Sequence, residues 1–459
     1  MRGLIATRQG QWDSVAIATA VLLAFAFLAG GASRLHELRL ALVELSALPL
    51  LVLAVFALLR QGELNRHPLA FGILAATAAL PLLQLVPLPP AVWTGLPGRA
   101  EPALALELAG VAPGWTPLSL TPDKTWRSVL ALLPPVAAFL GALAVSGETR
   151  RRLVLLALGL TLASIAFGAA QLASGGVGLY PWPTTDRGSV VGFFANRNHL
   201  ATLCLVALPF AAVLGAAGLR HDGAKSRLWL ATVVIAVIVI AIGVIRSRAG
   251  ILLVWPVLGG SLLAAWIASG RGRPAPLLLV MVGAVTAALI AVGVFALDPI
   301  LARFELIDSQ EGRFENWPVV AQAADAYLPL GSGIGSFDAV YRSVEPLARL
   351  DATYFNQAHN EYLETWLETG WLGAGVLVAF LVWFGRRSWT AWRARPSTAR
   401  DLQRAASIAI GAILLHSAVD YPLRTETIAV MFALCCALLE LAGRTDAELA
   451  GPAPQRRSA

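Results

Sequence analysis

Charged residues are scarce in this sequence. Asp, Glu, Lys and Arg make up 14% of its 459 residues, whereas 57% are hydrophobic. Soluble globular domains carry about 25% charged residues. The shortage of charge excludes an ordinary soluble protein, and the sequence predicts an integral membrane protein.

Cysteine is also rare, and its positions exclude cysteine chemistry. Cys204, Cys435 and Cys436 all lie inside apolar runs, and two of them are adjacent. Neither a disulfide framework nor a metal-binding spacing fits this pattern. We therefore expect that cysteine chemistry is not the function.

Lysine is almost absent, since Lys124 and Lys225 are the only two. The net charge of +7 therefore depends on arginine. In a membrane protein, a positive excess usually marks cytoplasmic loops. We expect no nucleic-acid partner.

Apolar runs long enough to cross a bilayer recur along the chain. A transmembrane helix needs about 17–25 mostly apolar residues. We therefore predict an all-α polytopic membrane protein of about 12 helices, with the first run retained as a signal anchor. The predicted spans are 14–31, 40–59, 68–88, 127–146, 153–173, 199–219, 228–245, 250–270, 276–297, 370–385, 404–419 and 426–443.

The basic residues predict how the chain is oriented. If both termini are cytoplasmic, most of the arginines lie in cytoplasmic segments, including the run Arg150 to Arg152. We therefore divide the chain into membrane helices at 1–297 with an outer loop at 89–126, a large outer loop at 298–369, further membrane helices at 370–445, and a cytoplasmic tail at 446–459.

Arginines on the outer side run against this orientation rule. An arginine at membrane depth costs about 2.5–3.5 kcal/mol on insertion. A bound anion would offset that cost, and snorkelling of the side chains towards water is the alternative. These outer arginines are Arg187, Arg197, Arg246, Arg248, Arg303, Arg313, Arg342 and Arg349.

The segment that opens the sixth predicted span is a further candidate for anion binding. It contains Asn196, Arg197, Asn198 and His199, which can donate hydrogen bonds to an anion at a helix start. Helix capping together with snorkelling is the alternative reading of these residues.

Two other motifs have structural explanations. Gly331, Gly333 and Gly335 form a Gly-x-Gly-x-Gly pattern, but a nucleotide fingerprint also needs a preceding strand, so we expect a tight turn. His416 and Asp420 stand four residues apart, and two ligands are too few for a metal site. We expect a structural hydrogen bond there, with Arg424 as the partner of Asp420.

The sharpest signal is the segment from Phe355 to Gly370, which contains His359. On a helix, His359 shares one face with the apolar residues, and the carboxylates share the opposite face. We therefore expect the carboxylates to face water and not to orient the imidazole. A lone histidine on an apolar face is usually a hydrogen-bonded core residue, but the nearby arginines favour catalysis. The apolar residues are Tyr362, Leu363 and Trp366, and the carboxylates are Glu361, Glu364 and Glu368.

Several of these segments resemble the O-antigen ligase and polymerase family of bacterial envelopes. The likeness is most specific from about residue 192 to 375, is weaker at 416–420, and rests only on hydropathy in the first four spans. It is carried by Ser247-Arg248-Ala249-Gly250 at a short outer turn, Arg313 followed by Trp317, the turn from Gly331 to Phe337, and His359-Asn360-Glu361-Tyr362-Leu363 leading to Glu368-Thr369-Gly370-Trp371-Leu372-Gly373.

The resemblance implies a fold, a reaction and a location. Members have about twelve helices and a large periplasmic loop, and they transfer a glycan from undecaprenyl diphosphate to a hydroxyl acceptor without metal or nucleotide. The acceptor is lipid A-core, a growing glycan or a protein. The resemblance places the chain in the bacterial inner membrane, with a periplasmic active site.

The resemblance also implies roles for individual residues. His359 matches the catalytic histidine, acting as a general base, and Arg248 and Arg313 match the arginines that hold the diphosphate. Arg246 is an addition at the same turn. The remaining candidates for the donor or acceptor site are Arg197, Asn198, His199, Asn360 and Arg342.

A transporter or flippase of lipid-linked glycans is the alternative function. It would predict inverted repeats and helices broken near the middle of the bilayer. Here the polar residues gather at one membrane face, no repeat is visible, and Pro209 and Pro256 are the only hints of broken helices.

Overall fold

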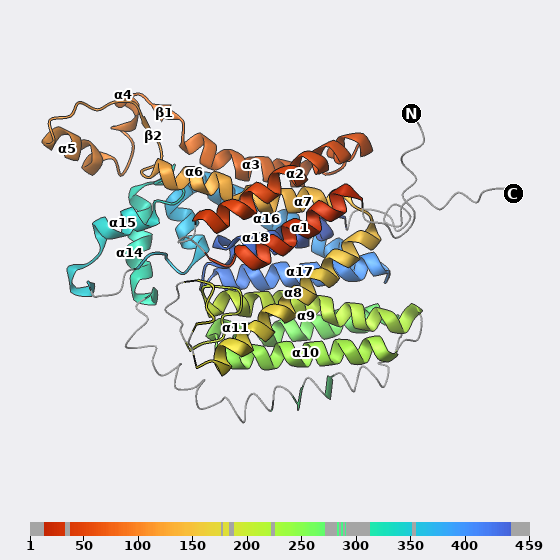
Figure 1. Cartoon of the computed structure of the whole chain (residues 1–459). Helices are drawn as coiled ribbons and strands as arrows, with labels where there is room; N and C mark the ends of the chain where they lie inside the picture. The colour runs from red at the N-terminus through yellow and green to blue at the C-terminus, as the bar shows by residue number, and fades with distance from the viewer. Residues whose placement is uncertain are drawn as a thin grey trace.

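The chain folds into a bundle of long helices (Figure 1). The structure is a computed structural model and describes residues 13–32, 37–175, 178–182, 188–221, 225–270, 313–350 and 355–441, together with 282–283, 286–287 and 290. Apart from these last positions, the predicted span 276–297 lies outside the described residues, as do segment 298–312 and the predicted tail.

The long helices coincide with every predicted span other than 276–297. Seven segments of the described residues are long and apolar enough to cross a membrane. The prediction of an all-α polytopic membrane protein is therefore confirmed. The helices are α1 (Ser14–Ala29), α2 (Glu37–Gln61), α3 (Pro68–Gln84), α6 (Pro122–Ala131), α7 (Leu133–Ala144), α8 (Gly147–Ala173), α9 (Arg197–His221), α10 (Lys225–Ile245), α11 (Arg248–Ala268), α16 (Glu361–Arg393), α17 (Thr398–Ser417) and α18 (Glu426–Glu440).

Polar caps fix the starts of several helices. The Asp13 carboxylate accepts from the Ala16 N–H at 2.7 Å. Ser146, Ser247 and Ser397 each accept in the same way from the residue three positions on. Each cap satisfies one of the N–H groups that a helix leaves unpaired at its start. These boundaries are therefore encoded locally.

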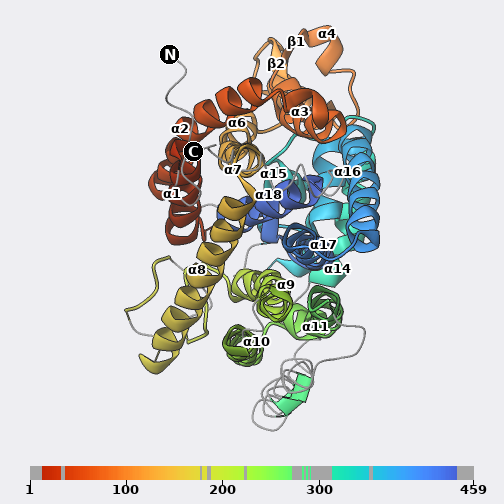
Figure 2. The same cartoon turned by 90° about the vertical axis from the view of Figure 1, so that its right-hand side faces the viewer.

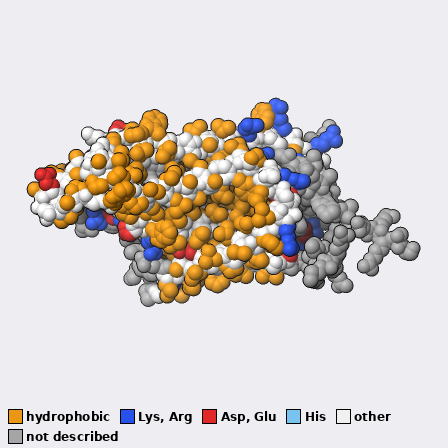
Figure 3. All heavy atoms as spheres, turned by 90° about the horizontal axis from the view of Figure 1, so that it is seen from above, with side chains coloured by type: hydrophobic (Ala, Val, Ile, Leu, Met, Phe, Trp, Pro, Cys, Tyr) orange, Lys and Arg blue, Asp and Glu red, His pale blue; other side chains and the backbone are white. Residues whose placement is uncertain are grey.

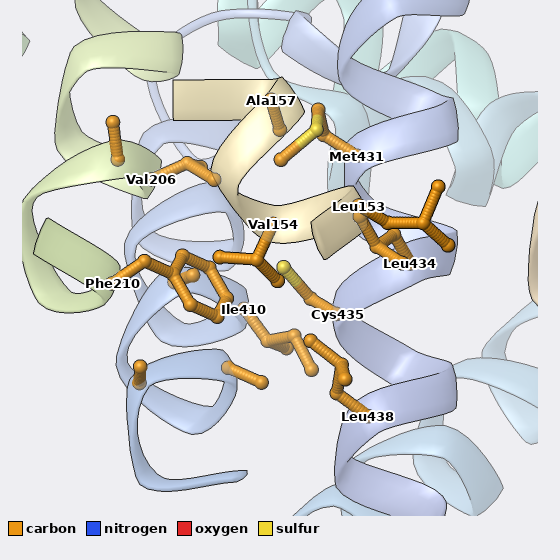
Figure 4. Packing of buried hydrophobic residues seen from close by; sticks show 14 of the residues in the cluster. Leu153, Val154, Ala157, Val206, Phe210, Ile410, Met431, Leu434, Cys435 and Leu438 are labelled. Atoms are coloured by element: carbon orange, nitrogen blue, oxygen red, sulfur yellow. The ribbon is translucent and has the colours of Figure 1, made fainter. Parts of the chain in front are cut away.

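Helix α9 lies among α8, α10, α11 and α17 (Figure 2). Within its membrane window, 94% of the residues are buried, so neighbouring helices shield it from lipid. Figure 4 shows how tightly the apolar side chains pack beside it, with Val206 and Phe210 of α9, Val154 of α8, Ile410 of α17 and Met431 of α18.

The flank of the bundle is apolar as well. Hydrophobic side chains cover much of the surface in Figure 3, and Lys and Arg gather towards one end. Large apolar residues are exposed on several helices, such as Val52 on α2, Leu230 on α10 and Val378 on α16. A surface of this kind is suited to contact with lipid.

The short elements lie at one end of the bundle (Figure 1). The loop 89–126 projects there and contains two short helices and one strand, which pairs antiparallel with the two residues before the loop. The segment between α14 and α16 also lies there. These elements are β1 (Pro87–Leu88), α4 (Pro90–Trp93), α5 (Ala100–Leu108), β2 (Thr116–Pro117), α14 (Arg313–Ala326), α15 (Phe337–Val344) and η2 (Leu347–Arg349); the remaining short helices are η1 (Leu64–Arg66) and η3 (Pro422–Arg424).

Helix α16 contains a break at Gly370, where φ is 54° and ψ is −142°. A Cβ at this position would lie 2.2 Å from the carbonyl oxygen of Pro329, so only glycine fits. The N–H of Trp371 donates to that same carbonyl at 3.0 Å. The turn after α14 is therefore tied to α16 at the break.

Candidate active site

His359 lies immediately before helix α16. Asn360 is the N-cap residue, and its side chain accepts from the N–H groups of Tyr362 and Leu363, both at 3.1 Å. The prediction that His359 shares a helical face with apolar residues of α16 is therefore wrong, because the helix begins after Asn360. His359 has φ 51°, a left-handed conformation that costs about 1–3 kcal/mol in a non-glycine residue.

Contacts from two helices hold the segment that carries His359. Trp317 Nε1 donates to the carbonyl of Ala358 at 2.8 Å, and the N–H of Ala358 donates to Glu364 at 3.1 Å. Together with the cap of α16, these bonds fix the strained backbone of His359. Since Trp317 stands one turn after Arg313, the start of α14 lies close to this segment.

Asp420 is the hydrogen-bonding partner of His359. His359 Nδ1 lies 3.3 Å from Asp420 Oδ1, which also accepts from the N–H of Tyr421 at 2.9 Å. The His359 side chain is 20% exposed, whereas that of Asp420 is 1% exposed. The imidazole therefore reaches the surface while its carboxylate partner is sealed behind it.

The surroundings of Asp420 favour its ionised form. Burial raises the pKa of Asp420, but the hydrogen bond and charge of His359, with the charges of His199 and His416, outweigh burial and hold the pKa below its usual range. An ionised carboxylate keeps the proton of a neutral imidazole on Nδ1. The other ring nitrogen, Nε2, is then the proton acceptor.

Tyr421 separates His359 from a second histidine. Its ring centroid lies 4.8 Å from that of His359 and 5.3 Å from that of His199. His199 is 2% exposed, and neither of its ring nitrogens has a hydrogen-bond partner among the described residues. His199 therefore lies in the protein interior behind the His359 side chain.

The start of α9 shows the helix capping considered as an alternative. Asn196 Oδ1 accepts from the N–H of Asn198 at 2.8 Å, and the side chain of Asn198 is partly exposed. Arg197 is also partly exposed, and its Nη1 lies 3.5 Å from Ser189 Oγ.

The turn between α10 and α11 carries two of the predicted diphosphate ligands. Arg246 is exposed and has φ 56°, and Arg248 is the partly exposed first residue of α11. A Cβ on Gly250 would lie 2.9 Å from the Cβ of Ala201, so the start of α11 packs against the start of α9. The first turn of α9 also carries His199, which places these arginines at the same end of the bundle as His359.

The other predicted arginines are placed differently. Arg313 is the first residue of α14, and its side chain lies outside what the structure describes. Arg342 is exposed and donates to Asp338 at 2.8 Å, while Lys124 binds the second oxygen of that carboxylate at 3.1 Å. Within the described residues, Arg342 is therefore part of a surface ion-pair network. Arg187, Arg303 and the side chain of Arg349 also lie outside the described part of the chain.

The glutamates of α16 are buried, so the prediction that they face water is wrong. Glu361, Glu364 and Glu368 are 8%, 0% and 1% exposed. Arg424 Nη2 lies 3.2 Å from Glu364 and 3.0 Å from Glu368. The prediction that Arg424 pairs with Asp420 is therefore wrong, because Arg424 pairs with these two carboxylates. Lipid accepts apolar side chains as readily as the protein interior does, so the polar face of α16 turns inward.

The Gly-x-Gly-x-Gly segment is a turn anchored on α16. Glu368 Oε1 accepts from the N–H groups of Gly335 and Phe337 at 2.8 and 3.2 Å. The Glu368 carbonyl accepts from the N–H of Gly333 at 2.9 Å. Gly333 and Gly335 have positive φ, and a Cβ on either would lie under 3 Å from Ser119 or Lys124. These glycines are therefore explained by close packing of backbone segments.

His416 is buried. Its Nδ1 lies 2.8 Å from the hydroxyl of Thr202 on α9, and its backbone carbonyl accepts from the N–H of Asp420 at 3.0 Å. Across the described residues, no group of three His, Cys, Asp or Glu side chains is placed to hold a metal ion.

Sequence reasoning missed Asp420 as the direct partner of His359. The two residues are 61 positions apart, and His416 offered a closer partner in the sequence. A usable signal existed, because a carboxylate in a short hairpin between two apolar runs is costly and is usually retained for function. The assembled arrangement, a partly exposed imidazole supported by a buried carboxylate, is suited to general base catalysis.

Comparison with protein-family models gives a match over part of the chain. Residues 231–378 match the family model described as O-antigen ligase. The matched segment contains Arg246, Arg248, Arg313 and His359, and Asp420 lies beyond it. The resemblance seen in the sequence is thereby confirmed, and it supports glycan transfer of the ligase or polymerase kind from a lipid-linked donor. A search of curated proteins found no match.

Proposed function

We propose that this multi-pass membrane protein, with its O-antigen ligase domain, transfers a glycan from undecaprenyl diphosphate to a hydroxyl acceptor. The reaction takes place at the periplasmic face of the bacterial inner membrane. The His359 and Asp420 pair carries this proposal, because a partly exposed imidazole backed by a buried carboxylate lies at the same end of the bundle as the arginine turn.

His359 acts as the general base. Its Nδ1–H donates to Asp420, and its Nε2 takes the proton from the attacking hydroxyl. Asp420 stabilises the imidazolium that forms, because it stays ionised when the ring gains charge. General base catalysis of this kind contributes about 10²- to 10⁴-fold in rate.

Arg248 and Arg313 hold the diphosphate, and Arg246 adds positive charge at the same turn. As the bond to the sugar breaks, the diphosphate gains negative charge. Guanidinium groups can bind it through paired hydrogen bonds, each charge-assisted bond contributing about 1.5–3 kcal/mol. The arginines supply the positive charge that a divalent cation supplies in other phosphate chemistry.

The reaction is a direct displacement with inversion. The acceptor oxygen forms a bond to the anomeric carbon, and the bond from that carbon to the diphosphate oxygen breaks. The hydroxyl proton goes to His359, and undecaprenyl diphosphate leaves. Arg197, Asn198 and His199, at the start of α9, are the further candidates for contacts with the donor or acceptor. Asn360 contributes by capping α16 and so fixing the backbone of His359.

Replacing the imidazole tests this assignment. His359→Ala should abolish transfer, because no other side chain takes the proton, while the protein still inserts into the membrane and still binds a lipid-linked donor. Transfer is measured by mass spectrometry of the acceptor and donor binding by co-purification of the lipid. Wild-type turnover by the alanine variant would exclude His359 as the base.

A further inference from the structure

An apolar cavity of about 280 Å³ lies between α3, α7, α16 and α18. Three helical segments each contribute residues at positions i, i+3, i+4 and i+7, which lie on one helix face. Such a stripe is about 10 Å long, so the cavity follows the helices for about that distance. The stripes are Ala70, Ile73, Leu74 and Thr77; Leu132, Pro135, Val136 and Phe139; and Ala429, Phe432, Ala433 and Cys436.

The two ends of the cavity differ. At one end, Trp383 lines the cavity and donates its indole N–H to the buried Glu440, which also binds Arg387 and His67. At the other end lies Leu423, three residues after Asp420. A polar cluster thus lies at the end remote from the candidate active site, and the loop that carries Asp420 lies at the near end.

The cavity and the arginine turn lie on opposite sides of the His359 and Asp420 pair. The pair joins the start of α16 to the loop after α17. Figure 2 shows α17 between α11, which begins at Arg248, and α18, which lines the cavity. If the arginines hold the donor on the α11 side of His359, the α18 side of His359 is free for the acceptor.

We propose that this cavity binds one fatty acyl chain of a lipid-anchored acceptor, and the proposal rests on the function proposed above. Apolar cavities of about 150 Å³ exclude water and take up apolar molecules, and this one is larger and lies in a membrane-spanning bundle. A chain with its end near Trp383 has its head group near Asp420. An undecaprenyl chain is several times longer than the cavity, and a polypeptide acceptor has no such chain. Of the three acceptor classes, the cavity fits lipid A-core.

Photolabelling tests the occupant directly. Full-length protein in nanodiscs is irradiated with lipid A, phosphatidylethanolamine or undecaprenyl phosphate, each carrying a diazirine in its hydrocarbon chain. We expect the lipid A probe to label peptides that contain 70–77 and 429–436, and excess unlabelled lipid A to suppress that labelling about ten-fold. Labelling by phosphatidylethanolamine that lipid A does not displace, labelling by undecaprenyl phosphate alone, or no labelling would each overturn the proposal.

A pair of variants on one helix gives the functional test. Thr77→Phe fills the cavity, whereas Ala75→Phe adds the same ring on the exposed side of α3. We expect Thr77→Phe to raise KM for lipid A-core about ten-fold without changing KM for the donor, and Ala75→Phe to change neither. Unchanged KM in Thr77→Phe overturns the cavity proposal alone, whereas wild-type protein that transfers no glycan to any acceptor overturns the function.

Discussion

At the scale of single residues, the backbone of His359 is unusual because a left-handed conformation is held by surrounding contacts. Trp317 and Glu364 bind Ala358, and Asn360 caps the helix that follows. The strain is local to the residue assigned to catalysis, as often happens at functional sites. The backbone conformation at His359, which these contacts hold, thereby helps to direct the imidazole at Asp420.

Asp420→Asn tests the role of the carboxylate. An amide has no charge to stabilise the imidazolium and can favour the wrong tautomer, so transfer should fall about 10²- to 10⁴-fold while donor binding persists. Initial rates and donor affinity are measured with purified protein. Asp325→Asn, at an exposed position on α14, is the matched control and should keep full activity. Equal rates in the two variants would remove Asp420 from the mechanism.

Arg248→Lys and Arg313→Lys test how the diphosphate is held. Lysine keeps the charge but presents a single ammonium group, so paired hydrogen bonds to phosphate oxygens are lost. Loss of one charge-assisted bond of about 2 kcal/mol lowers the rate about 30-fold. Steady-state kinetics with varied donor measure the effect, and full activity of both lysine variants counts against the assignment.

Single residues also show how much of the candidate site could be predicted from the sequence. Motif likeness selects His359, Arg248 and Arg313 as candidates without a structure. Asp420 was not identified as the partner because its contact with His359 depends on how α16 packs against α17, which no local pattern specifies.

At the scale of elements, Glu368 connects three parts of the fold. Its carboxylate binds the turn before α15 and Arg424 of η3, and its carbonyl accepts from the side chain of Gln84 at the end of α3. Glu368 therefore joins α16 to α3, to the turn before α15 and to the loop that carries Asp420.

Glu368→Ala should destabilise the protein. It leaves Arg424 with one carboxylate and removes the acceptor for two N–H groups in a buried site, a loss of about 3–5 kcal/mol. Thermal unfolding in detergent, followed by intrinsic fluorescence, should show a lower Tm. Glu107→Ala on α5, which is exposed, is the control. A Tm equal to that of the control would show that the buried network contributes little.

The elements were largely predictable because their apolar runs are long and their caps are local. Which face of α16 turns towards the bundle interior could not be predicted in the same way. In water, apolar side chains turn to the core, but beside lipid they can face outward, so the same periodicity has the opposite meaning. The buried glutamates of α16 are the result.

At the scale of the whole molecule, residues from distant parts of the chain meet at one end of the bundle. Arg248, His199, His359 and Asp420 begin or end four different helices that pack against one another. The predicted orientation places this end at the periplasmic face, where a polyprenyl diphosphate carries its sugars. The packing of these helices thus fixes the geometry of the candidate site.

The transfer reaction itself is the most direct test. Purified protein in liposomes is mixed with a synthetic undecaprenyl diphosphate glycan and a hydroxyl acceptor, and the products are identified by mass spectrometry and their anomeric configuration by NMR. We predict a glycosylated acceptor of inverted configuration and an equal amount of undecaprenyl diphosphate, both missing with His359→Ala. Movement of the intact lipid-linked glycan across the liposome membrane, with no glycosylated product from any acceptor, would contradict the account and identify a transporter.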